Sequence, residues 1–101
     1  MIPNAELTLP LSQIAEVCRR FEVRELSVFG SAVRGNMHPE SDIDLLVEFA
    51  PDASIGLFEF SAMERALGEL LGRKVDLVSK RGLKPRIRPY VLKDARVIYA
   101  A

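Results

Sequence analysis

The sequence has 101 residues, with 14 Lys plus Arg, 14 Asp plus Glu, one His, one Cys and no Trp. This length predicts one domain, and 49% hydrophobic with 28% charged residues is the mixture of a globular chain rather than a disordered one. No apolar run approaches the roughly 18 residues of a membrane span, the N-terminus lacks a secretory pattern, and the zero net charge argues against direct capture of nucleic acid.

Helical and extended segments alternate in the first half of the chain. Apolar residues at helical spacing predict an amphipathic helix over residues 11–21. Residues 25–29 are rich in strand-forming side chains and end at Gly30-Ser31, which predicts a first strand followed by a short helix over residues 31–34. Asn36 and Pro39 then indicate a loop.

The second half continues this alternation. Residues 43–49 form a strand too apolar for a half-exposed position, so we place it centrally in the sheet. A helix over 57–71 ends at Gly72. The remaining predictions are a strand over 74–78, a loop over 80–85, a short helix over 89–95 and a final strand over 96–99. The order predicts a single α/β (α+β) domain over residues 1–101.

The lone cysteine and the small size of the core bear on the cellular setting of the chain and on its assembly. Cys18 lies on the apolar side of the first helix, so we expect a buried thiol, and a lone cysteine indicates a reducing, cytoplasmic setting. A core of this size is only marginally stable alone, which leaves a homo-oligomer or a complex with a partner chain open. We expect Tyr90 and Tyr99 to pack in the core rather than to serve as self-modification targets.

Asp42 and Asp44 stand at the start of the second predicted strand. Alternate side chains of a strand share one face, so both carboxylates point the same way, roughly 7 Å apart along the chain. Like charges at this spacing repel each other, and a divalent cation between them removes the repulsion. Mg²⁺ commonly takes one or two carboxylates together with waters and substrate phosphates. The pair therefore indicates a metal site, although ordinary surface strands also end in acids.

Gly30 and Ser31 follow the first predicted strand directly. A glycine lets the backbone approach a ligand closely, and a serine at a helix start offers hydroxyl and N–H groups where the helix dipole favours phosphate. An ordinary turn with a helix cap would use the same residues. Arg34, one helical turn later, is either a second phosphate contact or a solvated arginine.

Asp76 interrupts the apolar segment of residues 74–78. An acid within a hydrophobic strand is costly to bury unless it is paired or bound to metal, which favours a functional role. An aspartate on an edge strand is the alternative.

The charges are unevenly distributed. Residues 79–98 hold one acid, Asp94, against seven bases: Lys80, Arg81, Lys84, Arg86, Arg88, Lys93 and Arg96. One interpretation is a basic lobe that holds a polyanion or an acidic partner beside a carboxylate-rich metal site. The other is that these charges cover solvated faces.

These features occur in one order: Gly30-Ser31, ten further residues, Asp42-Ile43-Asp44, and an acid on the following strand. The combination resembles the polymerase-beta-type nucleotidyltransferase superfamily, most closely its minimal nucleotidyltransferase (MNT) branch. The resemblance extends over about residues 11–100 and is carried by residues 29–35, 41–49, 75–78 and 92–99.

The resemblance implies a polymerase-beta-like fold, a small mixed sheet flanked by helices. It also implies transfer of AMP from ATP to a hydroxyl, with release of pyrophosphate. By the same resemblance Asp42, Asp44 and Asp76 hold two Mg²⁺ ions, and Asp76 helps to deprotonate the acceptor. Gly30 and Ser31 would bind the β- and γ-phosphates of ATP, with Arg34 as a further phosphate contact.

Many MNT proteins act as antitoxins beside a HEPN-domain toxin and transfer AMP to a tyrosine of that toxin. We therefore expect a HEPN-domain partner that completes acceptor recognition, with no membrane or nucleic-acid partner. The basic segment from Lys80 to Arg96 would face this partner or the triphosphate. Two alternatives stay open: a small-molecule acceptor such as an aminoglycoside, or an antitoxin that masks its toxin by binding alone.

Overall fold

A four-stranded mixed sheet forms the centre of the computed structural model, which describes residues 9–35 and 42–101. β1 runs antiparallel to both β2 and β4, whereas β2 and β3 run parallel. The predicted α/β (α+β) class, the mixed sheet and the central position of residues 43–49 are therefore confirmed. From edge to edge the strands are β3 (Val75–Ser79), β2 (Ile43–Phe49), β1 (Val23–Phe29) and β4 (Arg96–Ala100).

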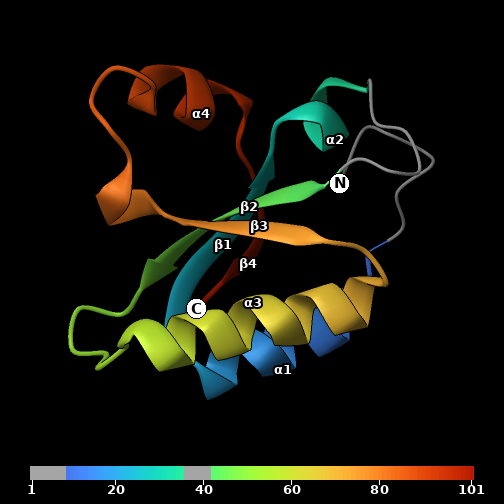
Figure 1. The fold of residues 1–101 in the computed structure, drawn as a ribbon, viewed down its shortest axis with the longest axis vertical. Coiled ribbons are helices and arrows are strands. Elements are labelled where there is room, and N and C mark those ends of the chain that lie inside the picture. Colours follow the sequence, from blue (N-terminus) through green and yellow to red (C-terminus); the bar gives the residue numbers. More distant parts are fainter. Residues whose placement is uncertain (1–8, 36–41) are drawn as a thin grey trace.

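Two helices, α1 (Leu11–Arg20) and α3 (Leu57–Leu71), cover one face of the sheet (Figure 1). Parallel neighbouring strands require a crossover connection, and α3 supplies it between β2 and β3. The main core lies between this face and the helices; its most buried side chains are Ile14, Cys18, Leu26, Val28, Ile43, Leu45, Val47, Met63 and Leu67.

The opposite face of the sheet carries α2 (Ser31–Arg34), the short 3₁₀ turn η1 (Lys80–Gly82) and α4 (Arg88–Asp94) (Figure 1). Lys80 anchors this region, because its Nζ lies 3.4 Å from an oxygen of Glu48 and 3.9 Å from one of Glu25. Arg88 in turn donates a hydrogen bond of 2.9 Å to the carbonyl of Lys80. These contacts hold the chain between β3 and α4 against this face.

Most predicted element boundaries are confirmed, and the differences are small. β1 begins at Val23 rather than at residue 25, because Val23 pairs with Phe49 across a bulge. β3 and α4 each lie one residue from their predicted positions, and the predicted loop of residues 80–85 contains η1. The loop predicted at residues 36–39 lies outside the described residues.

The predicted environments of three side chains can be compared with the structure. Cys18 is fully buried as predicted, and burial raises the pKa of its thiol to about 12, so it stays protonated at neutral pH. Tyr99 packs against the core, as predicted. The prediction was wrong for Tyr90, which is 74% exposed because the seven-residue α4 turns only one side toward the sheet.

Within the described ranges, no helix has the length and apolar character of a membrane span.

Candidate active site

The turn between β1 and α2 brings the backbone of Gly30 against the side chain of Asp44. Gly30 has φ 77° and ψ −146°, a conformation that L side chains rarely adopt. The amides of Val33 and Arg34 both donate to the Gly30 carbonyl at 3.1 Å, which closes the turn into α2. A Cβ atom at position 30 would lie 3.3 Å from the Asp44 Cγ and would collide with its Oδ2. Only glycine therefore lets the Asp44 carboxylate occupy this place.

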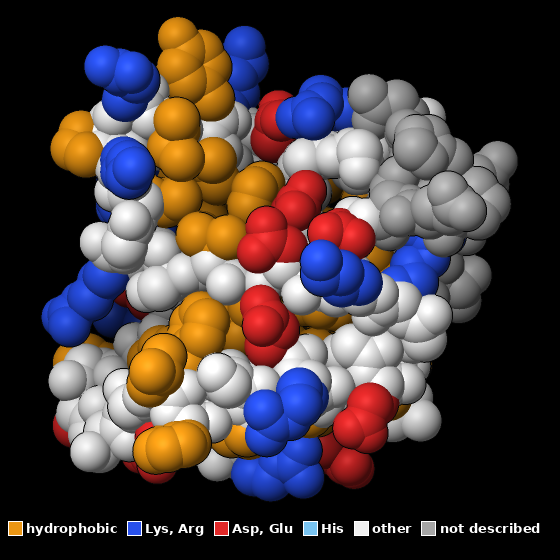
Figure 2. Space-filling model, in the orientation of Figure 1, with side chains coloured by type: hydrophobic (Ala, Val, Ile, Leu, Met, Phe, Trp, Pro, Cys, Tyr) orange, Lys and Arg blue, Asp and Glu red, His pale blue; other side chains and the backbone are white. Residues whose placement is uncertain are grey.

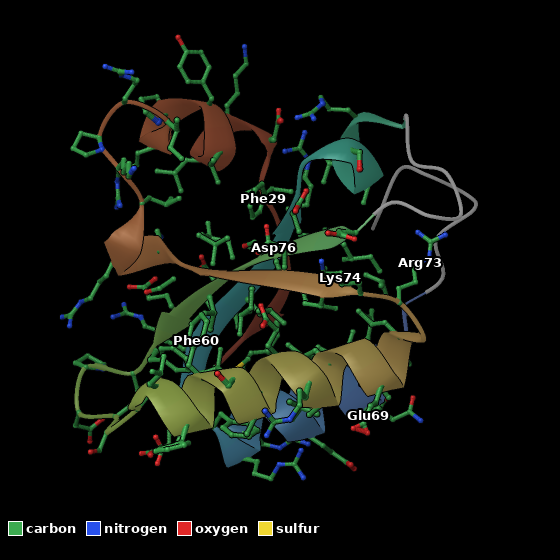
Figure 3. The ribbon with its side chains drawn as sticks, in the orientation of Figure 1. Phe29, Phe60, Glu69, Arg73, Lys74 and Asp76 are labelled. Atoms are coloured by element: carbon green, nitrogen blue, oxygen red, sulfur yellow. The ribbon has the colours of Figure 1, made fainter. Side chains whose placement is uncertain are left out.

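Asp44 stands between two strands that carry the other predicted site residues. In the antiparallel pair it lies opposite Phe29, and in the parallel pair it lies opposite Asp76. Neighbouring strands are roughly 4.8 Å apart, and directly paired residues project to the same face of a sheet. Phe29 and Asp76 lie near the middle of the view in Figure 3, below α2 and α4. The structure thus brings Asp44, Asp76 and the Gly30 turn together.

The three aspartates share the sheet face that α1 and α3 leave uncovered. Asp42 precedes β2 by one residue and is two residues from Asp44, so the strand geometry directs both to that face. Asp42 is exposed, and its Oδ2 lies 3.9 Å from the Nζ of Lys74. Lys74 was not among the predicted site residues, and nothing in the sequence beyond its place before β3 indicates this contact.

The surroundings of Asp44 change the pKa of its carboxyl group. Partial burial raises the pKa of its carboxyl above the ordinary value, and the negative charges of Asp76 and then Asp42 raise it further. The positive charge of Arg34 opposes these effects. The ionised site therefore holds mutually repelling carboxylates, an arrangement that a bound cation would relieve.

The donor set of this site fits Mg²⁺. Three carboxylates are hard oxygen ligands, and Mg²⁺ retains waters and recruits substrate phosphates rather than requiring a complete protein cage. In residues 9–35 and 42–101, no group of three acidic, histidine or cysteine side chains forms a ready-made cage of that kind. The carboxylates are thus neighbours on one face that would be drawn together by the ion and the triphosphate.

Arg34 does not lie free above the turn. Its Nη1 is 2.6 Å from the Asp94 Oδ2 at the end of α4, across 60 positions of sequence. A guanidinium has five N–H donors, so the other nitrogens can still bind a phosphate while this contact persists. Asp94 was not among the predicted site residues, because no local pattern reports a pairing at that separation.

The structure corrects the argument that singled out Asp76. The apolar neighbours of Asp76 predicted burial of its carboxylate, but β3 is an edge strand and Asp76 is exposed. The desolvation penalty therefore does not act on this side chain. Its position opposite Asp44, and not burial, makes it part of the site.

A separate hollow of about 390 Å³ lies at the far ends of β2 and β3. Phe49, Phe60, Arg24 and Arg81 contribute to its walls, whereas none of the predicted site residues does. The candidate site therefore rests on the convergence of carboxylates at the Gly30 turn and not on this hollow.

The chain is similar to a known protein family and to known proteins of that family. The model of the nucleotidyltransferase domain family matches residues 11–98. The protein adenylyltransferase MntA of Thermococcus cleftensis is 46% identical over 84 residues, covering 83% of this chain and 81% of the relative.

Solved structures agree with that match. A structure assigned as a minimal nucleotidyltransferase is 40% identical, with a TM-score of 0.72 over 85% of this chain and 86% of the other. A crystal structure of a toxin–antitoxin with AMP-PNP has a TM-score of 0.76 at 24% identity, over 92% of this chain and 75% of that one, which shows a shared fold.

Proposed function

The chain belongs to the nucleotidyltransferase domain family, and from that premise we propose that it transfers AMP from ATP to a hydroxyl group of a partner protein, with Mg²⁺. The name of the relative from Thermococcus cleftensis, a protein adenylyltransferase, supports AMP as the transferred group. The observation that carries the proposal is the placement of Asp44 between the Gly30 turn and Asp76. That placement sets the backbone at the start of α2 beside two carboxylates.

In this proposal each site residue has a defined role. The Gly30-Ser31 backbone and the Ser31 hydroxyl bind the β- and γ-phosphates at the start of α2, and Arg34 contacts the same phosphates. Asp42, Asp44 and Asp76 would hold Mg²⁺, which supplies charge neutralisation of the triphosphate and the leaving pyrophosphate. The exposure of Asp76 at the sheet edge leaves it accessible to an incoming acceptor.

The transfer step forms one bond and breaks another. The acceptor oxygen attacks the α-phosphorus of ATP, the bond from that phosphorus to the bridging oxygen breaks, and pyrophosphate leaves. Asp76 accepts the proton of the acceptor hydroxyl. The product is an AMP ester of the acceptor.

For the acceptor we propose a tyrosine of a HEPN-domain toxin in the cytoplasm, so that the chain acts as an antitoxin. This part of the proposal derives from the resemblance to the MNT branch. The shared fold of the toxin–antitoxin crystal structure is compatible with it.

A labelled transfer assay tests the proposed function. ATP labelled at its α-phosphate is incubated with Mg²⁺, this protein and a HEPN-domain protein, and we expect label on the HEPN-domain protein. The double variant Asp42→Asn/Asp44→Asn should transfer none, whereas Asp52→Asn, which changes an exposed acid in the turn after β2, should transfer normally.

The other outcomes identify the alternatives. Tight binding of the partner without label transfer would replace this proposal with masking by contact alone. Transfer to an aminoglycoside in place of the partner protein would indicate a small-molecule acceptor. Equal transfer by the double variant would contradict the assignment of the aspartates.

Replacing Arg34 by Ala is expected to weaken Mg²⁺-dependent ATP binding by about tenfold, because one charge-assisted phosphate contact is lost. AMP lacks the β- and γ-phosphates, so its affinity should stay unchanged. Isothermal titration with both nucleotides measures the difference. Global stability should hardly change, because an exposed ion pair such as Arg34–Asp94 contributes about 0–1 kcal/mol. Equal losses for ATP and AMP would contradict the assigned role.

A further inference from the structure

An exposed surface on and before α4 combines basic and apolar side chains. We call it the α4 surface and define it by Arg81, Lys84, Arg86, Ile87, Tyr90 and Lys93. Figure 2 shows hydrophobic side chains with Lys and Arg around them over α4, beside acidic side chains in the middle of the same face. The α4 surface therefore adjoins the candidate active site.

The positive charge of this surface faces outward. Three bases of the segment are engaged within the molecule: Lys80 with Glu25 and Glu48, Arg88 with the Lys80 carbonyl, and Arg96 with the carbonyls of residues 93–95. The only acid of the segment, Asp94, is paired with Arg34. The four bases of the α4 surface are all exposed. The positive charges of these four bases are thus available to a ligand.

The centre of the surface is apolar. Tyr90 is 74% exposed and Ile87, three residues before it, is 45% exposed. Aliphatic side chains add nothing to the binding of a phosphate chain, but apolar anchors within a charged rim are the ordinary anatomy of a protein interface. Tyr and Arg are also the residue types that dominate binding energy in such interfaces. The composition therefore favours a protein ligand over the triphosphate.

The location of α4 links this surface to the reaction. Asp94, the last residue of α4, contacts Arg34, the last residue of α2, and α2 begins at the Gly30 turn. A protein seated on α4 would lie beside the carboxylates. Asp76, at the exposed edge of the sheet, is the aspartate that such a protein could reach.

We propose that the α4 surface is the docking site of the acceptor protein, which meets it with an acidic segment that carries exposed apolar side chains. The proposal rests on the proposed function, since it assigns the surface to the acceptor of that reaction. Complementary charge would speed the encounter and orient the acceptor, and Tyr90 with Ile87 would hold it while its hydroxyl reaches the α-phosphorus.

The test compares two double variants that each remove one exposed aromatic and reverse one exposed arginine. Tyr90→Ser/Arg86→Glu changes the α4 surface, and Phe58→Ser/Arg65→Glu makes the matched change on α3, which lies on the other side of the sheet. KM for the HEPN-domain protein and the Kd of ATP with Mg²⁺ are measured for each. We expect the α4 variant to raise KM at least about tenfold and to leave the Kd of ATP within about twofold. The α3 variant should change neither.

Further measurements separate the rival explanations. Tyr90→Phe should retain the wild-type KM, since the ring and not the hydroxyl is the anchor, and rising salt should raise the wild-type KM more than that of the α4 variant. Unchanged KM in the α4 variant, an equal loss of ATP affinity, or an equal loss in the α3 variant would overturn the proposal. Tighter binding of a short single-stranded RNA than of the partner protein, abolished in the α4 variant, would also overturn it. Absence of transfer by the wild-type protein is a different result and refutes the proposed function itself.

Discussion

The Asp44→Asn variant is expected to lose transfer activity and to be more stable than the wild-type protein in the absence of divalent cations. The neutral amide removes the repulsion from Asp76 and Asp42 and the desolvation of a charge, which are the causes of the raised Asp44 pKa. Relief of this repulsion raises the melting temperature, which changes by about 4–8 °C per kcal/mol in a domain of this size. If Asp44 holds the metal as proposed, the loss of this ligand would cost several kcal/mol in the transition state and lower the rate by about 10³-fold or more.

Thermal melts with and without Mg²⁺–ATP, together with the labelled transfer assay, measure both effects. The wild-type protein should be stabilised by Mg²⁺–ATP, and Asp44→Asn should not. Asp52→Asn is the matched control, because it removes an exposed carboxylate outside the site and should preserve the Mg²⁺–ATP stabilisation. An Asp44→Asn variant that melts lower than the wild-type protein without cations would show that this carboxylate stabilises the fold instead of straining it.

The same electrostatics determine how the site responds to pH. The folded-state pKa of Asp44 lies above its unfolded value, so the folded protein loses stability as the pH rises from the unfolded value through the raised one. Metal binding has the opposite dependence, because the ion requires the deprotonated carboxylate and competes with the proton. Mg²⁺ affinity, measured by titration in the presence of ATP, should therefore fall as the pH drops through the raised Asp44 pKa.

Gly30→Ala is expected to have the second largest effect. The Cβ would force a residue with φ 77° and ψ −146° into a region that essentially only glycine occupies, which costs about 1–3 kcal/mol. It would also displace the Asp44 carboxylate, which fills the space above Gly30. We expect ATP affinity to fall by about 100-fold, because the backbone proposed to bind phosphate and the carboxylate proposed to bind the metal would shift together.

Gly35→Ala is the matched control for this substitution. Gly35 has φ 80° at the end of α2, but a Cβ there would have none of the described residues within 4 Å. It should lower stability by about 1 kcal/mol through backbone strain alone and preserve ATP binding. Calorimetric ATP affinities of the two variants separate strain from collision. Equal losses of affinity would show that strain at either glycine disrupts the site and that the contact with Asp44 is irrelevant.

The strands and long helices were predictable because each carries its own periodic signal. Residues 43–49 and 57–71 form elements at the bounds that apolar spacing and Gly72 indicate. The shared face of Asp42 and Asp44 was likewise predictable, since it follows from the two-residue repeat of a strand. These features depend on neighbours in sequence.

The features that were not predicted from the sequence depend on contacts between distant segments, which no local pattern encodes. The pairing of Asp44 with Asp76 needs the register of two parallel strands joined through α3, and the burial expected of Asp76 from its apolar neighbours does not occur. The contact between Arg34 and Asp94 joins segments 60 residues apart. The exposure of Tyr90 depends on which side of α4 meets the sheet, which its short sequence does not specify.

The edge position of β3 gives the site a weak point. Among the described residues β2 is its only strand neighbour, and on the α3 side the Leu77 amide donates to the Glu64 side chain at 2.8 Å. Edge elements fray at lower free energy than the global transition. Fraying of β3 would carry Asp76 away while β1, β2 and the Gly30 turn persist. On heating, transfer activity would then be lost at a temperature some degrees below the melting temperature of the rest of the molecule.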